Sequence, residues 1–227
     1  MTELCEIPII RIKPEAWRRL RNGHRWVFAN ELETAVSELP VGGIIQIIGN
    51  DGKHFGYAHA NPRTLIAARI LTYSTNPPGR EWLFSRLDAA YRMREQLGFG
   101  NVYRLVFSEA DSLPGLIIDR YDEHFVIQIL TAGMEFWRSH IVDWLRKQFH
   151  PQSLHFRNDS PYRIQEGLSA ENVTMIGEPP DRFRWETDGV IQLANLKSGQ
   201  KTGSFLDQRI NRTAIDPYVT PNSIVLD

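Results

Sequence analysis

The feature that most constrains the fold is a change in hydrophobic periodicity at Pro77-Pro78-Gly79. Before it, short β-branched runs such as Ile44–Ile48 alternate with turn sequences, which is typical of a small β-barrel. Asp51-Gly52 lies between two of these runs and favours a hairpin, because a type I′ turn needs positive φ. After the break, apolar residues recur at helical spacing over residues 81–97. The switch predicts two separate cores, one on each side of the break.

The first of these units is expected to occupy residues 1–74 and the second residues 78–178. In the second unit, further strands are expected at 102–107, 116–120, 125–130 and 153–157, and a second amphipathic helix at 135–149. This mixture predicts an α+β unit with hairpin-connected strands.

A third segment, residues 181–227, has a hairpin pattern that turns at Asp188-Gly189 and then a helix expected to start near Asp207. It ends on Ser223–Asp227, which has the pattern of a buried strand that has just begun. Because a free-standing domain rarely finishes on such a strand, we expect the chain to be a truncated part of a longer protein.

The 227 residues have the composition of an ordinary soluble protein, with 42% hydrophobic and 23% charged residues. No stretch approaches the roughly 18 apolar residues of a membrane span, and acids stand where a signal peptide has bases. We therefore expect a cytoplasmic protein without a membrane partner. Cys5 is the only cysteine, so an intrachain disulfide is excluded. The seven histidines show no metal-ligand spacing, and no metal site is expected.

A net charge of −1 conceals a basic segment near the N-terminus. The candidate RNA-binding residues in it are Lys13, Arg18, Arg19, Arg21, His24 and Arg25, preceded by Arg11. They are interleaved with Trp17, Trp26 and Phe28, so phosphate contacts and base-stacking faces occur together. The alternative is that the arginines only solvate a surface turn or helix and that the aromatic residues belong to the core.

In residues 108–121 two acids precede a Pro-Gly turn, and the strand that follows ends on three polar residues. Asp111, Asp119, Arg120 and Tyr121 are therefore candidates for a substrate cleft. The residues alone favour a simpler interpretation, a hairpin with a surface ion pair, because nothing in the pattern sets a catalytic distance.

The loop over residues 199–209 combines glycines, a lysine and hydroxyl groups directly before the predicted helix. Such a loop suits a carboxylate or phosphate, because a helix N-terminus offers free N–H groups. The spacing of a P-loop is absent.

Five segments together resemble the RlmI-type large-subunit rRNA (cytosine-5)-methyltransferases, and they occur in the order of that family. These segments are Ile12–Phe28, Gly56–Pro62, Arg104–Tyr121, Arg157–Gly167 and Lys201–Arg209. The resemblance implies an N-terminal PUA domain for RNA, a middle strand-strand-helix-strand-strand domain and a Rossmann-like α/β methyltransferase domain. Residues 181–227 would then be the truncated beginning of the last domain.

The resemblance also implies that the 201–209 loop closes over the methionine end of S-adenosylmethionine. The residues carried over to this role are Lys201, Thr202, Gly203, Phe205, Asp207, Gln208 and Arg209. The glycine-rich adenosine-binding turn, the ribose-binding acid and the catalytic segment of the family are absent from this sequence. Cytosine-5 methylation needs a catalytic thiolate, and Cys5 lies in the wrong domain for it. We therefore expect a parent enzyme that uses S-adenosylmethionine, and a chain without catalytic residues that binds no cofactor alone.

The leading interpretation is thus the N-terminal part of an rRNA methyltransferase, with rRNA as its partner. The alternative is a stand-alone RNA-binding module with a PUA domain and no chemistry. A third interpretation is a family member that modifies another RNA or base. The sequence leaves a homodimer open.

Overall fold

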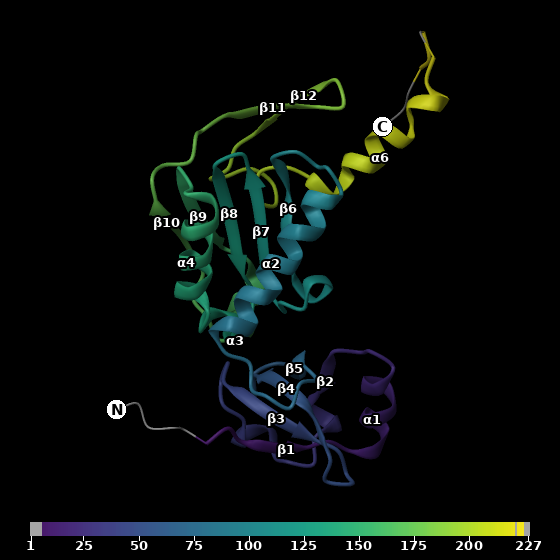
Figure 1. Cartoon of the computed structure of the whole chain (residues 1–227), viewed down its shortest axis with the longest axis vertical. Helices are drawn as coiled ribbons and strands as arrows, with labels where there is room; N and C mark the ends of the chain where they lie inside the picture. The colour runs from purple at the N-terminus through teal and green to yellow at the C-terminus, as the bar shows by residue number, and fades with distance from the viewer. Residues whose placement is uncertain (1–5, 221, 225–227) are drawn as a thin grey trace.

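The computed structural model describes residues 6–220 and 222–224 (Figure 1). In this part of the chain two five-stranded sheets lie one above the other in the view of Figure 1, and a two-stranded hairpin lies beyond the upper sheet. None of the helices described there is long and apolar enough to cross a membrane.

The first sheet has the strand order β1-β3-β4-β5-β2. Its strands are β1 (Ile9–Arg11), β2 (Trp26–Phe28), β3 (Ile44–Ile48), β4 (His54–Ala60) and β5 (Ile66–Thr72), with short helical segments α1 (Pro14–Arg21), η1 (Ala29–Glu31) and η2 (Val36–Glu38) between them. The β3–β4 hairpin predicted at Asp51-Gly52 is confirmed. β1 and β2 are not paired with each other, and an isolated bridge between Ile12 and Leu32 joins the segments that follow them. The predicted barrel is therefore only partly closed among the described strands.

The second sheet has the order β10-β9-β8-β7-β6, and only its β8–β9 pair is parallel. Its strands are β6 (Val102–Phe107), β7 (Leu116–Tyr121), β8 (His124–Ile129), β9 (Ser153–Asn158) and β10 (Glu171–Ile176); its helical segments are α2 (Arg80–Gln96), η3 (Ser108–Asp111), α3 (Ala132–Glu135), α4 (Arg138–Phe149) and α5 (Pro161–Gln165). The helix predicted at 135–149 is observed as α4, which begins only at Arg138, because Trp137 leaves helical geometry between α3 and α4. A parallel pair needs a crossover, and α3 and α4 supply it.

Helices pack against one face of the second sheet, and a hairpin packs against the other. Leu83 and Leu87 of α2 pack with Ile118 and Phe125 in one buried cluster, which also takes residues of α4. On the opposite face, the hairpin of β11 (Phe183–Thr187) and β12 (Val190–Ala194) packs through Phe183 and Trp185 against Tyr121 and Val126. The predicted turn is confirmed, since Asp188 and Gly189 have φ of 54° and 75°, as a type I′ turn requires.

The segment after the hairpin contains η4 (Leu206–Gln208), α6 (Arg209–Ala214) and η5 (Asp216–Tyr218), which confirms a helix starting near Asp207. The predicted buried strand at 223–227 is wrong for its first two residues. Ser223 and Ile224 are outside any strand, and the Ile224 side chain is fully exposed. Residues 225–227 lie outside the described part of the chain.

We call the part of the chain that contains the first sheet the first domain, and the part that contains the second sheet the second domain. A buried carboxylate joins these two domains. Glu166 follows α5 and is only 3% exposed. It accepts hydrogen bonds from Asn61 Nδ2 at 2.6 Å and from the backbone N–H of Ala132 at 3.1 Å. Arg69 of β5 forms an ion pair with it at 2.9 Å. Two of these three partners come from the first domain, so the carboxylate is neutralised only when the domains are docked.

A second buried contact lies beside the first. Trp137 donates its indole N–H to Nε2 of His59 at 2.9 Å, and both side chains are buried. Burial, with a smaller contribution from the nearby Arg69, lowers the pKa of His59 to about 3. The ring is therefore neutral at physiological pH, as its role as an acceptor requires.

We predict that Glu166→Ala lowers the free energy of unfolding by about 3–5 kcal/mol, because it leaves Arg69 buried without a counter-charge. The measurement is urea denaturation. Glu33→Ala is the matched control: its ion pair with Arg11 is 3.6 Å long and exposed, so a loss of about 1 kcal/mol or less is expected. Equal losses for the two variants would show that Glu166 does not hold the junction.

Candidate nucleic-acid interface and cofactor loop

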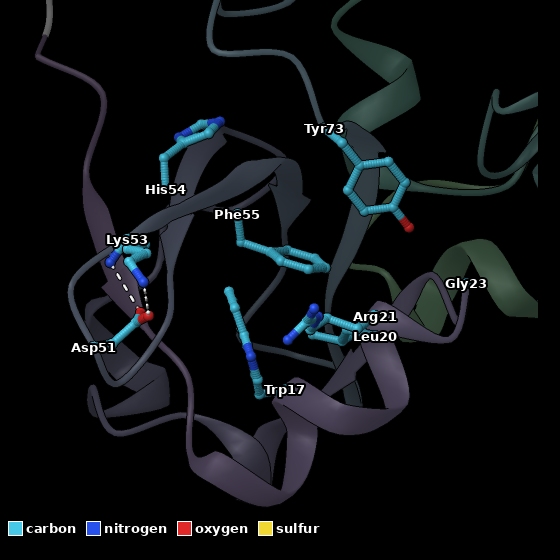
Figure 2. Close-up of a pocket in the computed structure, with 9 residues that line it drawn as sticks. All are labelled: Trp17, Leu20, Arg21, Gly23, Asp51, Lys53, His54, Phe55 and Tyr73. Carbon is cyan, nitrogen blue, oxygen red and sulfur yellow. Dashed lines mark hydrogen bonds and ion pairs between the residues drawn. The ribbon is translucent and has the colours of Figure 1, made fainter.

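A hollow of about 530 Å³ lies on the first domain beside α1 (Figure 2). Its aromatic lining consists of Trp17 from α1, Phe55 from β4 and Tyr73 directly after β5. The ring centroids of Trp17 and Phe55 are 5.0 Å apart, and those of Phe55 and Tyr73 are 5.3 Å apart. The three rings thus form one continuous aromatic surface.

Helical spacing places a cation on this surface. α1 begins with Pro14 at its first position and buries Ala16 and Leu20. Trp17 and Arg21 are four residues apart and therefore lie side by side on the helix, with the guanidinium 6.0 Å from the indole centroid.

Two more cations flank the same hollow. Arg25 lies 5.8 Å from the Tyr73 ring centroid, and exposed Lys53 lines the opposite side, paired with Asp51 at 3.3 Å. Figure 2 shows Arg21 and Lys53 on either side of Phe55. Rings with adjacent cations can take a stacked base and its phosphate.

The basic segment divides into two groups. Arg19 is held inside the domain, where it pairs with Glu31, donates to the carbonyl of Trp26 and lies 5.0 Å from the Phe28 ring. His24 accepts from Arg19 and from the Trp26 N–H, and Lys13 donates to the Asn30 carbonyl at 2.8 Å.

Arg18 and Arg21, by contrast, are exposed and have no acidic partner within ion-pair distance among the described residues. The sequence pattern does not distinguish among the six candidates, whereas in the structure Arg18 and Arg21 are exposed and the half-buried Arg25 lies over the Tyr73 ring.

Sequence reasoning did not include Phe55, Tyr73 or Lys53 in the interface. They come from a strand, a strand end and a hairpin loop that are distant from α1 in sequence, so no local pattern connects them. The hairpin predicted at Asp51-Gly52 is the sequence feature that could have pointed to this part of the interface, since it places Lys53 and Phe55 next to a turn.

The four candidates for a substrate cleft are divided between two faces of the second sheet. Asp111 pairs with Arg94 of α2 at 2.5 Å. Asp119 and Tyr121 face the hairpin, while Arg120 points to the helices and lies 4.9 Å from the Phe149 ring. They do not line one cleft in this structure.

The interpretation of a surface ion pair was wrong. Asp119 is completely buried and forms a two-pronged ion pair with Arg104, with hydrogen bonds of 2.8 and 2.9 Å. Burial also raises the pKa of the neighbouring Tyr121 phenol, with the Asp119 charge adding to the effect. Asp119 of β7 is therefore joined to β6 through its ion pair with Arg104.

Asp119 also anchors the loop predicted to bind a cofactor. Thr202 is fully buried and donates its hydroxyl to the Asp119 carboxylate. Arg157 of β9 donates to the carbonyl of Gly199. The centre of the loop is thus attached to the second sheet.

The charged residues of the loop are all paired within the chain. Lys201 contacts both carboxylate oxygens of Asp207 at 3.1 Å and lies 4.3 Å from the Phe205 ring centroid. Arg209 pairs with Asp188 of the hairpin at 3.0 Å. Of the other candidates, Gln208 accepts from Asn211, and Gly203 lies near Leu196 and Tyr121.

The hollow next to these residues is small. It has a volume of about 250 Å³ and lies between Leu206, Asp207 and Arg209 on one side and β6 and α2 on the other. Among the described residues, no group of three or more His, Cys, Asp or Glu side chains could hold a metal ion.

Comparison with known proteins agrees with this architecture. The family model described as a PUA-like domain matches residues 10–73, which contain the first sheet and the aromatic hollow. Two solved methyltransferase structures share the fold over 92% of this chain at 17% identity: a candidate SAM-dependent methyltransferase from Streptococcus mutans, with a TM-score of 0.75, and one complexed with SAH, with a TM-score of 0.76. The fold is thus a PUA-like domain joined to further elements seen in methyltransferases.

The curated relatives are more specific. Ribosomal RNA large subunit methyltransferase I of Pseudoalteromonas atlantica is 32% identical over 221 residues, which are 95% of this chain and 56% of that protein. The protein of the same name from Aliivibrio fischeri is 30% identical over 92% of this chain and 54% of its own length. The resemblance to the RlmI-type rRNA methyltransferases is confirmed over most of the chain, and the chain spans about half the length of these relatives.

We predict that Thr202→Val releases the 199–206 segment from the second sheet, because it removes the donor to the buried Asp119. Hydrogen–deuterium exchange of these amides should become faster. Thr213→Val is the control, since the Thr213 hydroxyl donates only within its own helix, to the Ile210 carbonyl. Unchanged exchange in the Thr202 variant would mean that the loop is held by other contacts.

Proposed function

We propose that this chain binds RNA through the aromatic hollow of its PUA-like domain and the exposed arginines beside it. The observation that carries the proposal is the continuous surface of Trp17, Phe55 and Tyr73, with Arg21 and Arg25 against its rings. Base stacking on such rings tolerates different sequences, and phosphate contacts add affinity that depends on salt. Relatives named as rRNA methyltransferases make large-subunit rRNA the favoured partner.

We further propose that the chain functions in an S-adenosylmethionine-dependent rRNA methyltransferase that makes 5-methylcytosine. In this proposal residues 1–74 form the RNA-binding PUA-like domain, 78–178 the middle α+β domain and 181–227 the first elements of the methyltransferase domain. In this proposal the chain supplies RNA binding. An aqueous cytoplasmic location agrees with such a substrate.

The cofactor proposal rests on the 201–209 loop. When bound, S-adenosylmethionine supplies the methyl group. Lys201, Asp207 and Arg209 suit its carboxylate and ammonium groups, but they are paired within the chain, and the adjacent hollow of about 250 Å³ is below the usual size of a small-molecule site. The residues present therefore fit only the amino-acid end of the cofactor.

We predict that Arg18→Ala/Arg21→Ala weakens binding to a structured RNA and lowers the slope of log K against log salt by about 1.5, since each lost phosphate contact removes about 0.7–0.9. Arg92→Ala/Arg146→Ala is the control with the same charge change, on exposed positions of α2 and α4. Fluorescence anisotropy at several salt concentrations provides both quantities. Equal losses of affinity and salt slope in both variants would show that binding depends on the total charge and not on the proposed interface.

We predict that isothermal calorimetry detects no S-adenosylmethionine binding to the 227-residue chain at micromolar concentrations, because the charged residues of the loop are already paired within the chain and the hollow is too small for the adenosine. Binding of micromolar affinity that Asp207→Ala abolishes would show instead that this loop is a complete site.

A further inference from the structure

A second hollow lies in the junction between the two domains and is not part of the proposed RNA face. It has a volume of about 480 Å³. Its walls come from β2 and the β4–β5 loop of the first domain, and from η3 and α5 of the second. The volume falls within the range of sites for small organic groups.

The walls of this junction cleft expose large apolar side chains. Trp26 is 37% exposed, Leu65 82% and Tyr162 65%. Trp26 donates its indole N–H to Glu109 across the junction at 2.9 Å, which fixes the position of the ring while it stays exposed. Aromatic surface held open in this way suits a planar ligand that stacks.

The polar groups of the cleft leave one cation unpaired. Glu109 accepts from Trp26 and Ser108, and Glu166 is neutralised by Arg69. No acidic side chain in the described part of the chain lies within ion-pair distance of exposed Arg63. The charges of the lining, Arg63 and Arg69 against Glu109 and Glu166, sum to zero, and Arg63 is the cation without a carboxylate partner.

The position of Arg63 depends on the glycine at 167. A Cβ atom at Gly167 would collide with the Arg63 guanidinium, and Gly167 has φ of +82°, a conformation that L side chains rarely adopt. The ends of the segments Gly56–Pro62 and Arg157–Gly167 thus meet beside this cleft.

The cleft and the aromatic hollow are approached by two consecutive residues. The Arg25 guanidinium lies over Tyr73, which lines the hollow, and Trp26 lines the cleft. The two surfaces are therefore neighbours along this stretch of the chain.

We propose that the junction cleft takes a single unstacked nucleotide of the bound RNA. Its base packs against Trp26 and Tyr162, the exposed Gln165 amide contacts the base edge, and Arg63 contacts a phosphate. This rests on the proposed function and deepens it, because it makes the preferred substrate an RNA with an unpaired nucleotide rather than a continuous helix.

The test uses the full chain and an RNA hairpin with one 2-aminopurine at an unpaired position. Stacking on aromatic rings is expected to quench its fluorescence on binding. Trp26→Ala and Tyr162→Ala should each weaken binding about 5- to 100-fold and reduce the quenching. Tyr162 is exposed, so its replacement leaves the fold intact, as circular dichroism would verify. Phe136→Ala, which removes an aromatic side chain that is 69% exposed outside the cleft, is the control and should change neither quantity.

The outcomes separate the two proposals. RNA binding with unchanged quenching and affinity in both cleft variants overturns the cleft proposal and leaves the proposed function standing. The same result would leave the cleft open to a protein partner. Absence of RNA binding by the wild-type chain overturns both.

Discussion

The buried carboxylate of Glu166 is the interaction on which the rest of the arrangement depends. An ionised group removed from water must be neutralised and hydrogen-bonded, and loss of one partner leaves an uncompensated charge. Here the partners are Asn61 and Arg69 of the first domain and the Ala132 N–H of the second. The docking of the two domains is therefore a condition for stability. The junction cleft, whose walls come from both domains, follows from that fixed orientation.

The arginines of this chain serve two purposes that the net charge conceals. Arg94 and Arg104 are largely buried and pair with Asp111 and Asp119, so they belong to the internal structure of the second domain. Arg18 and Arg21 are exposed, and Arg21 lies beside the Trp17 ring. A chain with net charge −1 can thus present exposed cations on one helix, because acids such as Asp111 and Asp119 neutralise other arginines.

Longer apolar segments were predictable from the sequence, and short or edge elements were not. The strands at 44–48 and 102–107 were predicted with their observed bounds. α1 was missed because it has only eight residues and buries only Ala16 and Leu20. β10 was missed because it is an edge strand without a fully buried residue. The basic residues of the site were visible in the sequence, whereas their aromatic neighbours come together only through the tertiary fold.

The most direct test of this account is photocrosslinking of the chain to an RNA hairpin that carries 4-thiouridine, with the linked peptides identified by mass spectrometry. The account predicts crosslinks to residues 14–28, 53–73 and 161–166, which contribute to the aromatic hollow and the junction cleft. Crosslinks confined to the β11–β12 hairpin, or to the surface around Phe136 and His140, would contradict it.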